Sequence, residues 1–225
     1  MTGISGQLTE PQGRSSGNGG GKFRWFSRRG RGRYGTAILG LGLVAAVFGT
    51  PWLKQGGGPD LLLQAAGWLL FLCGAILRMW AILHIGGRKN RLILDRGPYG
   101  LMRHPLYVGS FLIALSLALF LDSIVLLAAA LLTSVAYHLH VIPREEGRLI
   151  DKFGAPYLSY SRSTHRYLPA RSGRAGGGTP VLEVNLAALG TECTRAIWWA
   201  ALPLIAALVT WLRVQPWWPH WSPLP

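Results

Sequence analysis

The sequence predicts an all-α protein, a multi-pass transmembrane helix bundle of about five spans, with cytoplasmic loops and a short amphipathic helix that closes a pocket. Three observations support this fold class. Half of the 225 residues are hydrophobic, and only 14% are charged. The apolar residues fall in runs that approach or reach the thickness of a bilayer, and basic residues collect between these runs. The chain is therefore expected to be an integral membrane protein.

The formal net charge of +14 has two interpretations. On a soluble chain it would suggest a nucleic-acid partner. Here the Lys and Arg residues flank apolar runs, where orientation in the membrane and anionic lipid headgroups explain them more simply. Membrane lipids are thus expected as partners, and nucleic acid is not. The two cysteines, Cys73 and Cys193, have neither CxxC spacing nor an evident partner, which argues against a disulfide framework and against a metal site.

Residues 1–34 are expected to form a disordered basic tail. Gly and Ser are frequent in its first part, and the basic, aromatic sequence KFRWFSRRGRGRY follows without a sustained apolar period. RNA binding is one interpretation of this segment. The preferred interpretation is a topology signal whose aromatic side chains lie at the membrane interface.

The membrane domain is expected over residues 35–169 and opens with an apolar run at about 36–53. The long leader and the lack of a small-residue cleavage site favour a retained helix over a signal peptide. After the turn GGGPD, a second run covers about 61–84. It contains Arg78, which either extends to the interface, the preferred interpretation, or faces a polar site together with His84.

Three further apolar runs complete the predicted bundle. The runs at about 105–121 and 123–142 form a tight hairpin with Asp122 at its turn. Residues 170–180 are rich in Gly and are expected to be a flexible linker. Residues 181–225 are expected to contain a C-terminal transmembrane helix and an interfacial tail rich in Trp and Pro.

The segment that follows the hairpin is amphipathic. Leu149, Ile150 and Phe153 follow helical spacing among charged neighbours, and Gly154 interrupts the helix. Several aromatic side chains further on are expected to anchor the interface rather than to bind a ligand: Tyr157, Tyr160, and the pairs Trp198/Trp199 and Trp217/Trp218.

The charges of the loops predict the orientation. The N-terminal tail and the segments 84–104 and 143–174 are basic, whereas the intervening turns carry Lys54 as their only basic residue, beside acidic residues such as Asp122. With five spans the basic elements fall on one side of the membrane, which the positive-inside rule makes cytoplasmic, and the C-terminus lies outside. The two ends of the hairpin can then build one site on the cytoplasmic face.

Two motifs lie at these ends. The sequence GPYGLMRHPLYVG, a hydrophobic hairpin and then EEGRLIDKFGAPYLSY resemble the isoprenylcysteine carboxyl methyltransferase family and its phospholipid N-methyltransferase relatives. The resemblance covers residues 74–169, the motif core of the membrane domain. Because both halves agree in residue type, spacing and membrane context, the pattern is far more specific than an isolated RHP.

The resemblance implies an S-adenosylmethionine-dependent methyltransferase with its cofactor at the cytoplasmic membrane edge. The acceptor would be a lipid, a prenylated molecule or another lipophilic small molecule, methylated on a carboxylate, as in isoprenylcysteine, or on an amine. Four residues before the acidic pair, where prenylcysteine enzymes place a substrate-contacting Arg, this chain has Val141. The resemblance implies Arg103 and Glu146 as catalytic residues, and as cofactor-binding residues His84, Arg91, Leu92, Ile93, Leu94, Tyr99, His104, Pro105, Leu106, Tyr107 and Glu145.

The residue types suit this cofactor, which carries an adenine, a ribose diol, an ammonium, a carboxylate and a sulfonium. Glu145 can accept hydrogen bonds from the ribose or the ammonium, and Arg103 and His104 can serve the carboxylate. The rings of Tyr99 and Tyr107 can face the adenine or attract the sulfonium through cation–π contact.

Other interpretations of the same residues remain open. Glu145 and Glu146 could be a solvated face or acidic residues at a helix start. Because neighbouring residues on a helix point about 100° apart, at most one of the two carboxylates is expected to face the site. An amine acceptor would need a base, for which Glu146 or His104 could serve. His138 and His140 are separated by their spacing and are expected at the interface rather than on a metal.

The sequence leaves a second class of function open. A membrane module without catalytic activity could keep this scaffold and bind lipid or a partner protein through its basic cytoplasmic face.

Overall fold

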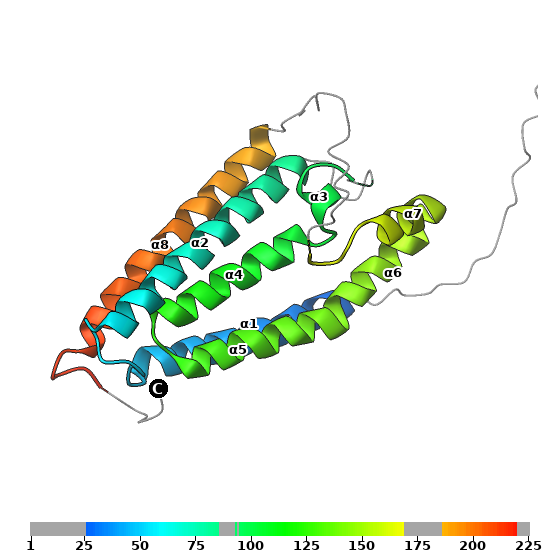
Figure 1. Cartoon of the computed structure of the whole chain (residues 1–225). Helices are drawn as coiled ribbons and strands as arrows, with labels where there is room; N and C mark the ends of the chain where they lie inside the picture. Colours follow the sequence, from blue (N-terminus) through cyan, green and yellow to red (C-terminus); the bar gives the residue numbers. More distant parts are fainter. Residues whose placement is uncertain (1–25, 86–92, 94, 169–185, 220–225) are drawn as a thin grey trace, which may run out of the picture.

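The computed structural model describes residues 26–85, 93, 95–168 and 186–219 (Figure 1). The regular elements in this part of the chain are helices, which confirms the all-α class. In chain order they are α1 (Phe26–Phe48), α2 (Gly58–Ile85), α3 (Pro98–Leu101), α4 (Pro105–Phe120), α5 (Ile124–Ala136), the π-helical turn η1 (Tyr137–Val141), α6 (Ile142–Phe153), α7 (Ala155–Ser163) and α8 (Leu186–Arg213).

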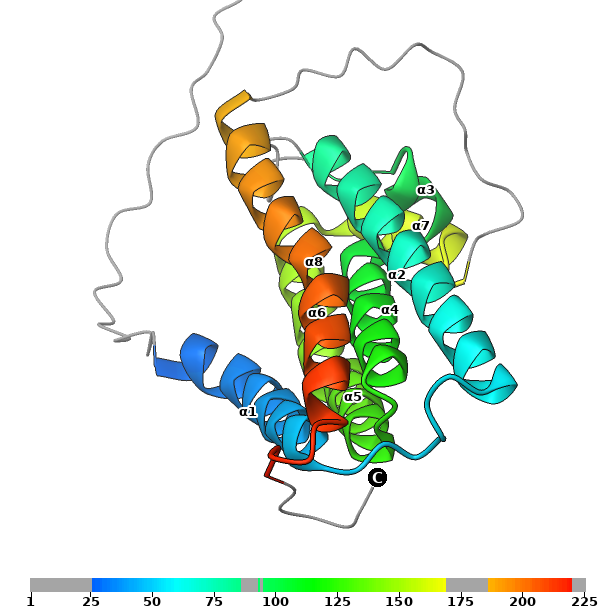
Figure 2. The same cartoon turned by 90° about the vertical axis from the view of Figure 1, so that its left-hand side faces the viewer.

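The long helices form an elongated bundle. Helices α2, α4 and α8 lie side by side, and α1 runs along α5 (Figures 1 and 2). Glycines allow α2 and α4 to cross closely: a Cβ atom added at Gly74 would lie 2.8 Å from the Gly109 carbonyl oxygen, and one added at Gly109 would lie 2.9 Å from the Gly74 carbonyl oxygen. The small residues therefore set the distance between α2 and α4, as they do in membrane helix pairs.

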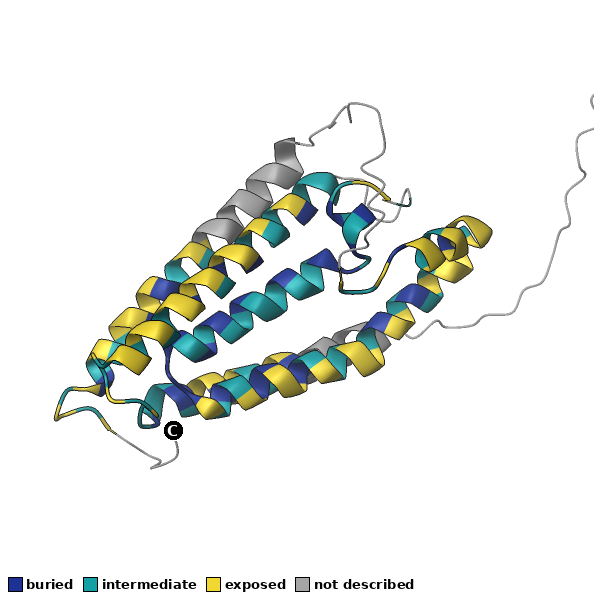
Figure 3. Ribbon diagram, viewed as in Figure 1, coloured by how far each residue is buried: buried dark blue, intermediate teal, exposed yellow. Residues whose placement is uncertain are grey.

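All five predicted apolar runs form helices. Two helical segments, Gly58–Ile85 and Ile124–Phe153, are long and apolar enough to cross a membrane, and three apolar helices are shorter: Gly35–Phe48, Pro105–Phe120 and Trp198–Arg213. Many residues of the long helices are exposed (Figure 3), and large apolar side chains are among them, with Leu62 74% and Leu132 62% exposed. Such a surface suits lipid rather than water, because large apolar patches are rare on soluble monomers.

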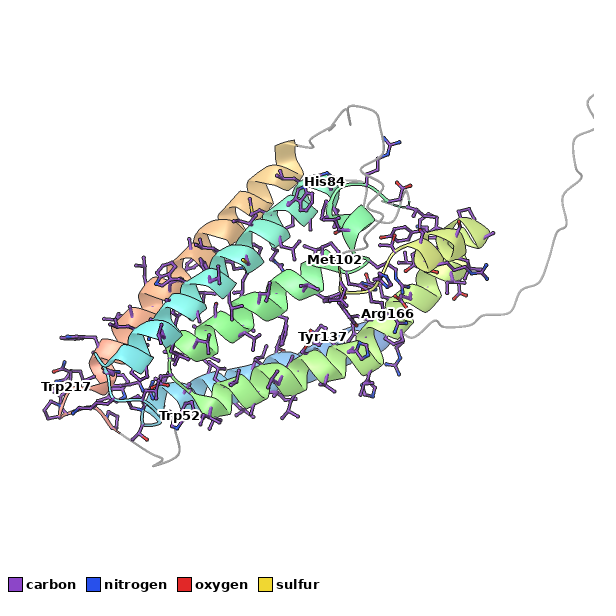
Figure 4. The ribbon with its side chains drawn as sticks, in the orientation of Figure 1. Trp52, His84, Met102, Tyr137, Arg166 and Trp217 are labelled. Carbon is purple, nitrogen blue, oxygen red and sulfur yellow. The ribbon has the colours of Figure 1, made fainter. Side chains whose placement is uncertain are left out.

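Trp52 and Trp217 lie at one end of the bundle (Figure 4). Two buried polar side chains, Arg213 and Asp122, hold the helices together at this end. Arg213, from the end of α8, donates to the Gly49 carbonyl from Nε at 3.0 Å and from Nη2 at 2.8 Å, and to the Leu121 carbonyl from Nη1. Asp122 accepts a hydrogen bond from the Leu53 amide at 2.6 Å. It forms the predicted turn between α4 and α5, with φ of 46°.

The second helix of the hairpin does not end near residue 142, where the predicted run ends. It continues through η1 into α6, and the Ile142 amide donates to the Tyr137 carbonyl, five residues back. Pro143 explains this turn, because proline lacks an amide hydrogen and its ring crowds the carbonyl four residues earlier. A wider π turn accommodates that crowding without ending the helix.

The amphipathic helix predicted from Leu149, Ile150 and Phe153 is confirmed as α6. It ends at Gly154, whose φ of 61° lies in the left-handed region that favours glycine. Helix α1 begins at Phe26 and so includes the end of the segment predicted as a basic tail. The linker predicted at 170–180 lies outside the described residues.

Candidate functional site

A pocket opens at the other end of the bundle, where α2 ends, α4 begins, and α3, α6 and α7 meet (Figure 1). We call it the edge pocket. Its volume is about 290 Å³, close to the lower end of cavities that bind small molecules. The residues that line it are Arg78, Ile85, Ile93, Tyr99, Arg103, His104, Pro105, Leu106, Tyr107, Ser110, Glu145, Leu149, Phe153, Tyr157 and Tyr160.

The backbone between α2 and α4 is shaped by glycine and proline. Gly97 has φ of 59°, and a Cβ atom there would lie 2.3 Å from Nε2 of His84. Pro98 then starts the short helix α3, and Pro105 starts α4. Both prolines suit the first turn of a helix, where the missing amide hydrogen has no helical partner. These residues place the side chains of α3 over the pocket.

The segment after α7 holds this stretch in place. The Arg103 amide donates to the His165 carbonyl at 2.8 Å, and the His104 amide donates to the Arg166 carbonyl at 3.2 Å. In Figure 4, Arg166 and Met102 lie near each other at this end of the bundle. Residues 164–167 thus complete the site, although no motif in the sequence pointed to Arg166.

Glu146 lies at the centre of a buried ion-pair cluster, which we call the Glu146 cluster and which consists of Glu146, Arg103, His104 and Arg166. Nη1 of Arg103 is 2.8 Å from Oε1 of Glu146. Arg166 donates from Nε to both oxygens at 3.1 Å and from Nη2 to Oε2 at 2.5 Å. These charge-assisted hydrogen bonds offset the cost of burying the carboxylate, and the hydrogen bond to Glu146 raises the pKa of Arg166.

His104 joins the same cluster through its ring. Its Nε2 lies 3.1 Å from Oε1 of Glu146, and the side chain is buried. Burial lowers the pKa of His104, and the hydrogen bond to Glu146 opposes this effect only in part. The imidazole is therefore neutral at pH 7, and it donates its Nε2 proton to the carboxylate.

Glu145 points into the edge pocket, whereas Glu146 is not part of its lining. Its Oε2 accepts a hydrogen bond of 2.7 Å from the hydroxyl of Tyr107, on the first turn of α4. The expectation that at most one of the two adjacent carboxylates faces the site is confirmed. One carboxylate is available to a ligand, and its neighbour joins α6 to the stretch around His104.

Tyrosines form the wall opposite α4. The Tyr160 hydroxyl donates to the Tyr99 carbonyl at 2.7 Å. The Tyr99 hydroxyl is buried and has no hydrogen-bond partner among the described residues. Burial raises the pKa of both tyrosines, so both hydroxyls are neutral donors. The interfacial role predicted for Tyr157 and Tyr160 is wrong, because both side chains line the pocket.

Arg78 also lines the pocket, so the preferred interpretation, that it extends to the interface, is wrong. Its Nη1 donates to the Ser110 hydroxyl and, at 3.5 Å, to the Leu106 carbonyl. Its guanidinium carbon lies 4.3 Å from the centre of the Trp199 ring, on α8. Trp199 was expected at the interface, and it instead supports a pocket residue through cation–π contact.

The other predicted residues divide into three groups. The pocket contains Ile93, Tyr99, Arg103, His104, Pro105, Leu106, Tyr107 and Glu145. His84 is not part of the lining; its Nδ1 lies 3.0 Å from the Trp80 carbonyl oxygen, and its ring packs on Gly97. The remaining three, Arg91, Leu92 and Leu94, lie outside the described residues.

A larger cavity of about 730 Å³ lies between α1, α4 and α5. We call it the apolar cavity. Tyr107 and Ser110 line both this cavity and the edge pocket, so the two spaces adjoin at the first turns of α4. Within the described part of the chain, no group of three or more His, Cys, Asp or Glu residues could hold a metal ion.

Comparison with known sequences connects this site to a family. Residues 62–155 match the family described as phospholipid methyltransferase. The nickel-cobalt-cadmium resistance protein NccN of Alcaligenes xylosoxydans xylosoxydans is 28% identical over 163 residues, which cover 72% of this chain and 75% of that protein. The cobalt-zinc-cadmium resistance protein CzcN of Cupriavidus metallidurans is 30% identical over 144 residues, 64% of this chain and 65% of that protein.

A third relative carries a methyltransferase name. The protein-S-isoprenylcysteine O-methyltransferase of Xenopus laevis is 30% identical over 117 residues, which cover 48% of this chain and 41% of that protein. The chain thus spans three quarters of NccN and less than two thirds of the other two relatives. No solved structure matches it. The resemblance that the two motifs predicted is confirmed.

Proposed function

We propose that this relative of the phospholipid methyltransferase family is an integral-membrane, S-adenosylmethionine-dependent methyltransferase that acts on a lipophilic acceptor. One observation carries the proposal: the RHP stretch and the acidic pair, at opposite ends of the hairpin, converge on one pocket through Tyr107 and Glu145. A protein that used only its basic face to bind lipid would have no need of a carboxylate directed into a pocket.

The pocket residues fit the proposed cofactor. Glu145 can accept hydrogen bonds from the ribose diol or the ammonium group, and the Tyr99 side chain lines the same pocket. Arg103 and His104, predicted to bind the carboxylate, are engaged by Glu146. We assign the cofactor's carboxylate to Arg78, the other Arg side chain that lines the pocket among the described residues. When bound, the cofactor would supply an activated methyl group on its sulfonium.

The protein's part in the reaction is mainly alignment. Methyl transfer is a displacement at carbon, which requires the acceptor atom, the methyl carbon and the leaving sulfur to lie in line. We propose that Glu146 and Arg103 serve catalysis by fixing the stretch from Tyr99 to Tyr107 against α6. Their buried contacts with His104 and Arg166 support this positioning role.

We further propose a multi-pass topology with the active site on the cytoplasmic face. The start of α1, the stretch before α4, and helices α6 and α7 all lie toward one end of the bundle (Figure 1). These are the segments rich in Lys and Arg, which the positive-inside rule places in the cytoplasm. Trp52 and Trp217 lie at the opposite end (Figure 4).

Saturable binding of S-adenosylmethionine or S-adenosylhomocysteine by the detergent-purified chain tests the proposal against the alternative of a non-catalytic lipid-binding module. Binding that Glu145→Gln weakens and Asp151→Asn leaves unchanged supports the enzyme, because Asp151 is an exposed carboxylate on the same helix. Absence of saturable binding in the unmodified chain overturns it. If the unmodified chain binds the cofactor, a labelled-methyl assay on whole membrane extract would identify the acceptor.

The names of NccN and CzcN support a second candidate, a role of this methyl transfer in resistance to cobalt, nickel, zinc or cadmium. Growth of a metal-sensitive bacterial host that expresses the chain tests this role. Protection by the unmodified chain and not by Glu145→Gln would support it. Equal protection by both would separate resistance from the proposed methyl transfer.

A further inference from the structure

Helix α6 carries a row of basic side chains that the proposed reaction does not use. Arg144, Arg148 and Lys152 follow one another at intervals of four residues, so they lie in one row along the helix. All three are exposed. We call these residues the basic row. At 1.5 Å per residue, the row extends over about 12 Å of the helix.

The acidic side chains of α6 mostly face the other way. Glu145 lines the edge pocket, and Glu146 is buried within the Glu146 cluster. Asp151 is the one exposed acidic residue of α6. The fold thus separates charges that are mixed in the sequence. It turns two carboxylates toward the protein and presents three cations to the outside.

The length of the helix places the basic row at the membrane surface. Ile124–Phe153 is one helical segment of 30 residues, and at 1.5 Å per residue it is about 45 Å long. The hydrocarbon core of a bilayer is about 30 Å thick, which about 20 helical residues span. In the proposed topology the span starts at Ile124, directly after the turn at Asp122, and it therefore reaches the phosphate layer near Arg144.

The basic row also continues the side of the helix that faces lipid. Leu139, within the π turn η1, is 59% exposed. Arg144 follows it by five residues, which is about one turn where a helix is π-helical. Arg144 therefore lies above an apolar side chain that the bilayer covers in the proposed topology.

We propose that the basic row binds the phosphate groups of anionic phospholipids in the cytoplasmic leaflet, and that this contact holds α6 in its orientation at the edge pocket. The inference rests on the proposed function and on its topology. Charge selects this partner, because the cytoplasmic leaflet is negatively charged and attracts basic residues that directly follow a transmembrane span. Each exposed Lys or Arg at the surface strengthens this attraction about fivefold.

The basic row and the edge pocket share one helix. The residue that follows each basic side chain belongs to the neighbouring row, about 100° around the helix, and this row lines the pocket with Glu145, Leu149 and Phe153. Nζ of Lys152 lies 5.5 Å from the centre of the Phe153 ring. A lipid bound along the basic row therefore opposes rotation of α6, which would move Glu145 out of the pocket. Affinity for the cofactor should then depend on the charge of the lipid.

Native mass spectrometry of the full chain measures the lipid contact, with phosphatidylglycerol and phosphatidylcholine of the same acyl chains as probes. We expect the chain to retain phosphatidylglycerol at least tenfold better. The triple variant Arg144→Gln, Arg148→Gln and Lys152→Gln should lose this preference. Lys54→Gln should keep it, because Lys54 is an exposed cation close in sequence to Trp52, at the opposite end of the bundle. Equal retention of both lipids by the unmodified chain, or an unchanged preference in the triple variant, overturns the site.

A charge-preserving variant distinguishes attraction by charge from a role of the guanidinium groups within the protein. Arg144→Lys combined with Arg148→Lys should keep the preference for phosphatidylglycerol, because a lysine at the surface attracts an anionic lipid as an arginine does. Loss of the preference in this variant would overturn recognition by charge.

The affinity for S-adenosylhomocysteine measures the coupling to the pocket, in nanodiscs of phosphatidylcholine alone and in nanodiscs of an equal mixture of the two lipids. The ammonium and the carboxylate of this ligand cancel, so a negative membrane does not concentrate it at the surface. We expect at least fivefold tighter binding in the mixed nanodiscs for the unmodified chain, and equal binding in both for the triple variant. Equal affinity in both membranes for the unmodified chain overturns the coupling.

The two measurements separate this inference from the proposed function. Binding of S-adenosylhomocysteine by the triple variant in phosphatidylcholine shows that the variant folds. If the triple variant does not bind, Arg144→Gln alone replaces it, with an expected loss of about fivefold in lipid preference. A lipid preference without any cofactor binding in the unmodified chain would disprove the methyltransferase and leave the lipid site. Cofactor binding without a lipid preference would do the reverse.

Discussion

His104 donates its Nε2 proton to Oε1 of Glu146 across 3.1 Å, although helices α4 and α5 and the turn η1 separate the two residues in the sequence. The contact joins the start of α4 to α6. Because Glu145 lies next to Glu146 on α6, this contact also fixes the orientation of the carboxylate that faces the edge pocket.

Loss of the charge at Glu146 should destabilise the fold. Glu146→Gln leaves Arg103 and Arg166 together without their carboxylate, and removing one partner of a buried ion pair costs about 3–5 kcal/mol. Arg166 is partly exposed, so we expect the low end, about 3 kcal/mol, or a thermal midpoint lower by about 6–12 °C. Thermal unfolding in detergent measures it, with Asp151→Asn as the control. A midpoint unchanged in Glu146→Gln would contradict the role of the cluster.

Substitution of Glu145 should weaken binding of the cofactor without unfolding the protein. Glu145→Ala removes the one carboxylate that lines the edge pocket among the described residues, and we expect at least tenfold weaker S-adenosylhomocysteine binding, about 1.4 kcal/mol. His104→Ala should weaken binding by a similar factor, because it releases the stretch that carries Tyr107. Calorimetric titration measures both variants. Affinity equal to that of the unmodified chain in both would remove these assignments.

Variants of two adjacent tryptophans on α8 distinguish two roles of such a side chain, the support of Arg78 and the anchoring of the helix in the membrane. Trp199→Leu removes the ring beside the Arg78 guanidinium, and a cation–π contact of about 0.5–2 kcal/mol predicts roughly twofold to thirtyfold weaker cofactor binding. Trp198 is 70% exposed, so Trp198→Leu serves as the matched control. Arg78→Met should weaken binding at least as much as Trp199→Leu does. Equal effects of the two tryptophan variants on cofactor binding would show that Trp199 does not support Arg78.

Acidification should destabilise the protein through His104. Its pKa in the folded state is lowered by burial, so the unfolded chain binds more protons once the pH falls below the ordinary histidine pKa of about 6.5. The free energy of unfolding is therefore constant above that pH and decreases as the pH falls through the folded-state pKa. Thermal midpoints measured from pH 8 to pH 5 test the sign. His104→Asn should reduce the slope, and an unchanged slope would assign it to other groups.

Local patterns predicted the elements of the fold. Helix α6 followed from the spacing of Leu149, Ile150 and Phe153, and the separation of Glu145 from Glu146 followed from the rotation between neighbouring helical residues. The π turn could not be predicted in this way. The predicted apolar run ended at about residue 142, next to Pro143, whereas the helix continues past this proline by way of η1.

Contacts between distant segments account for the residues that the sequence did not assign. Arg166 lies in a short irregular segment without periodicity, and its role depends on a carboxylate twenty residues earlier. The environment of Arg78 depends on Trp199, which belongs to another helix. Tyr160 was expected at the interface because tyrosine is common there, whereas its hydroxyl donates to the Tyr99 carbonyl inside the site.

The hydrogen bonds of Arg213 show that α8 folds together with the segment that matches the family. The family match ends at residue 155, but α8 satisfies the carbonyls of Gly49 and Leu121 at one end and supports Arg78 through Trp199 at the other. Removal of α8 would leave those carbonyls without these donors in an apolar setting. The unit of evolution and the unit of folding therefore differ in this chain, and a fragment cut at the family boundary lacks part of its own core.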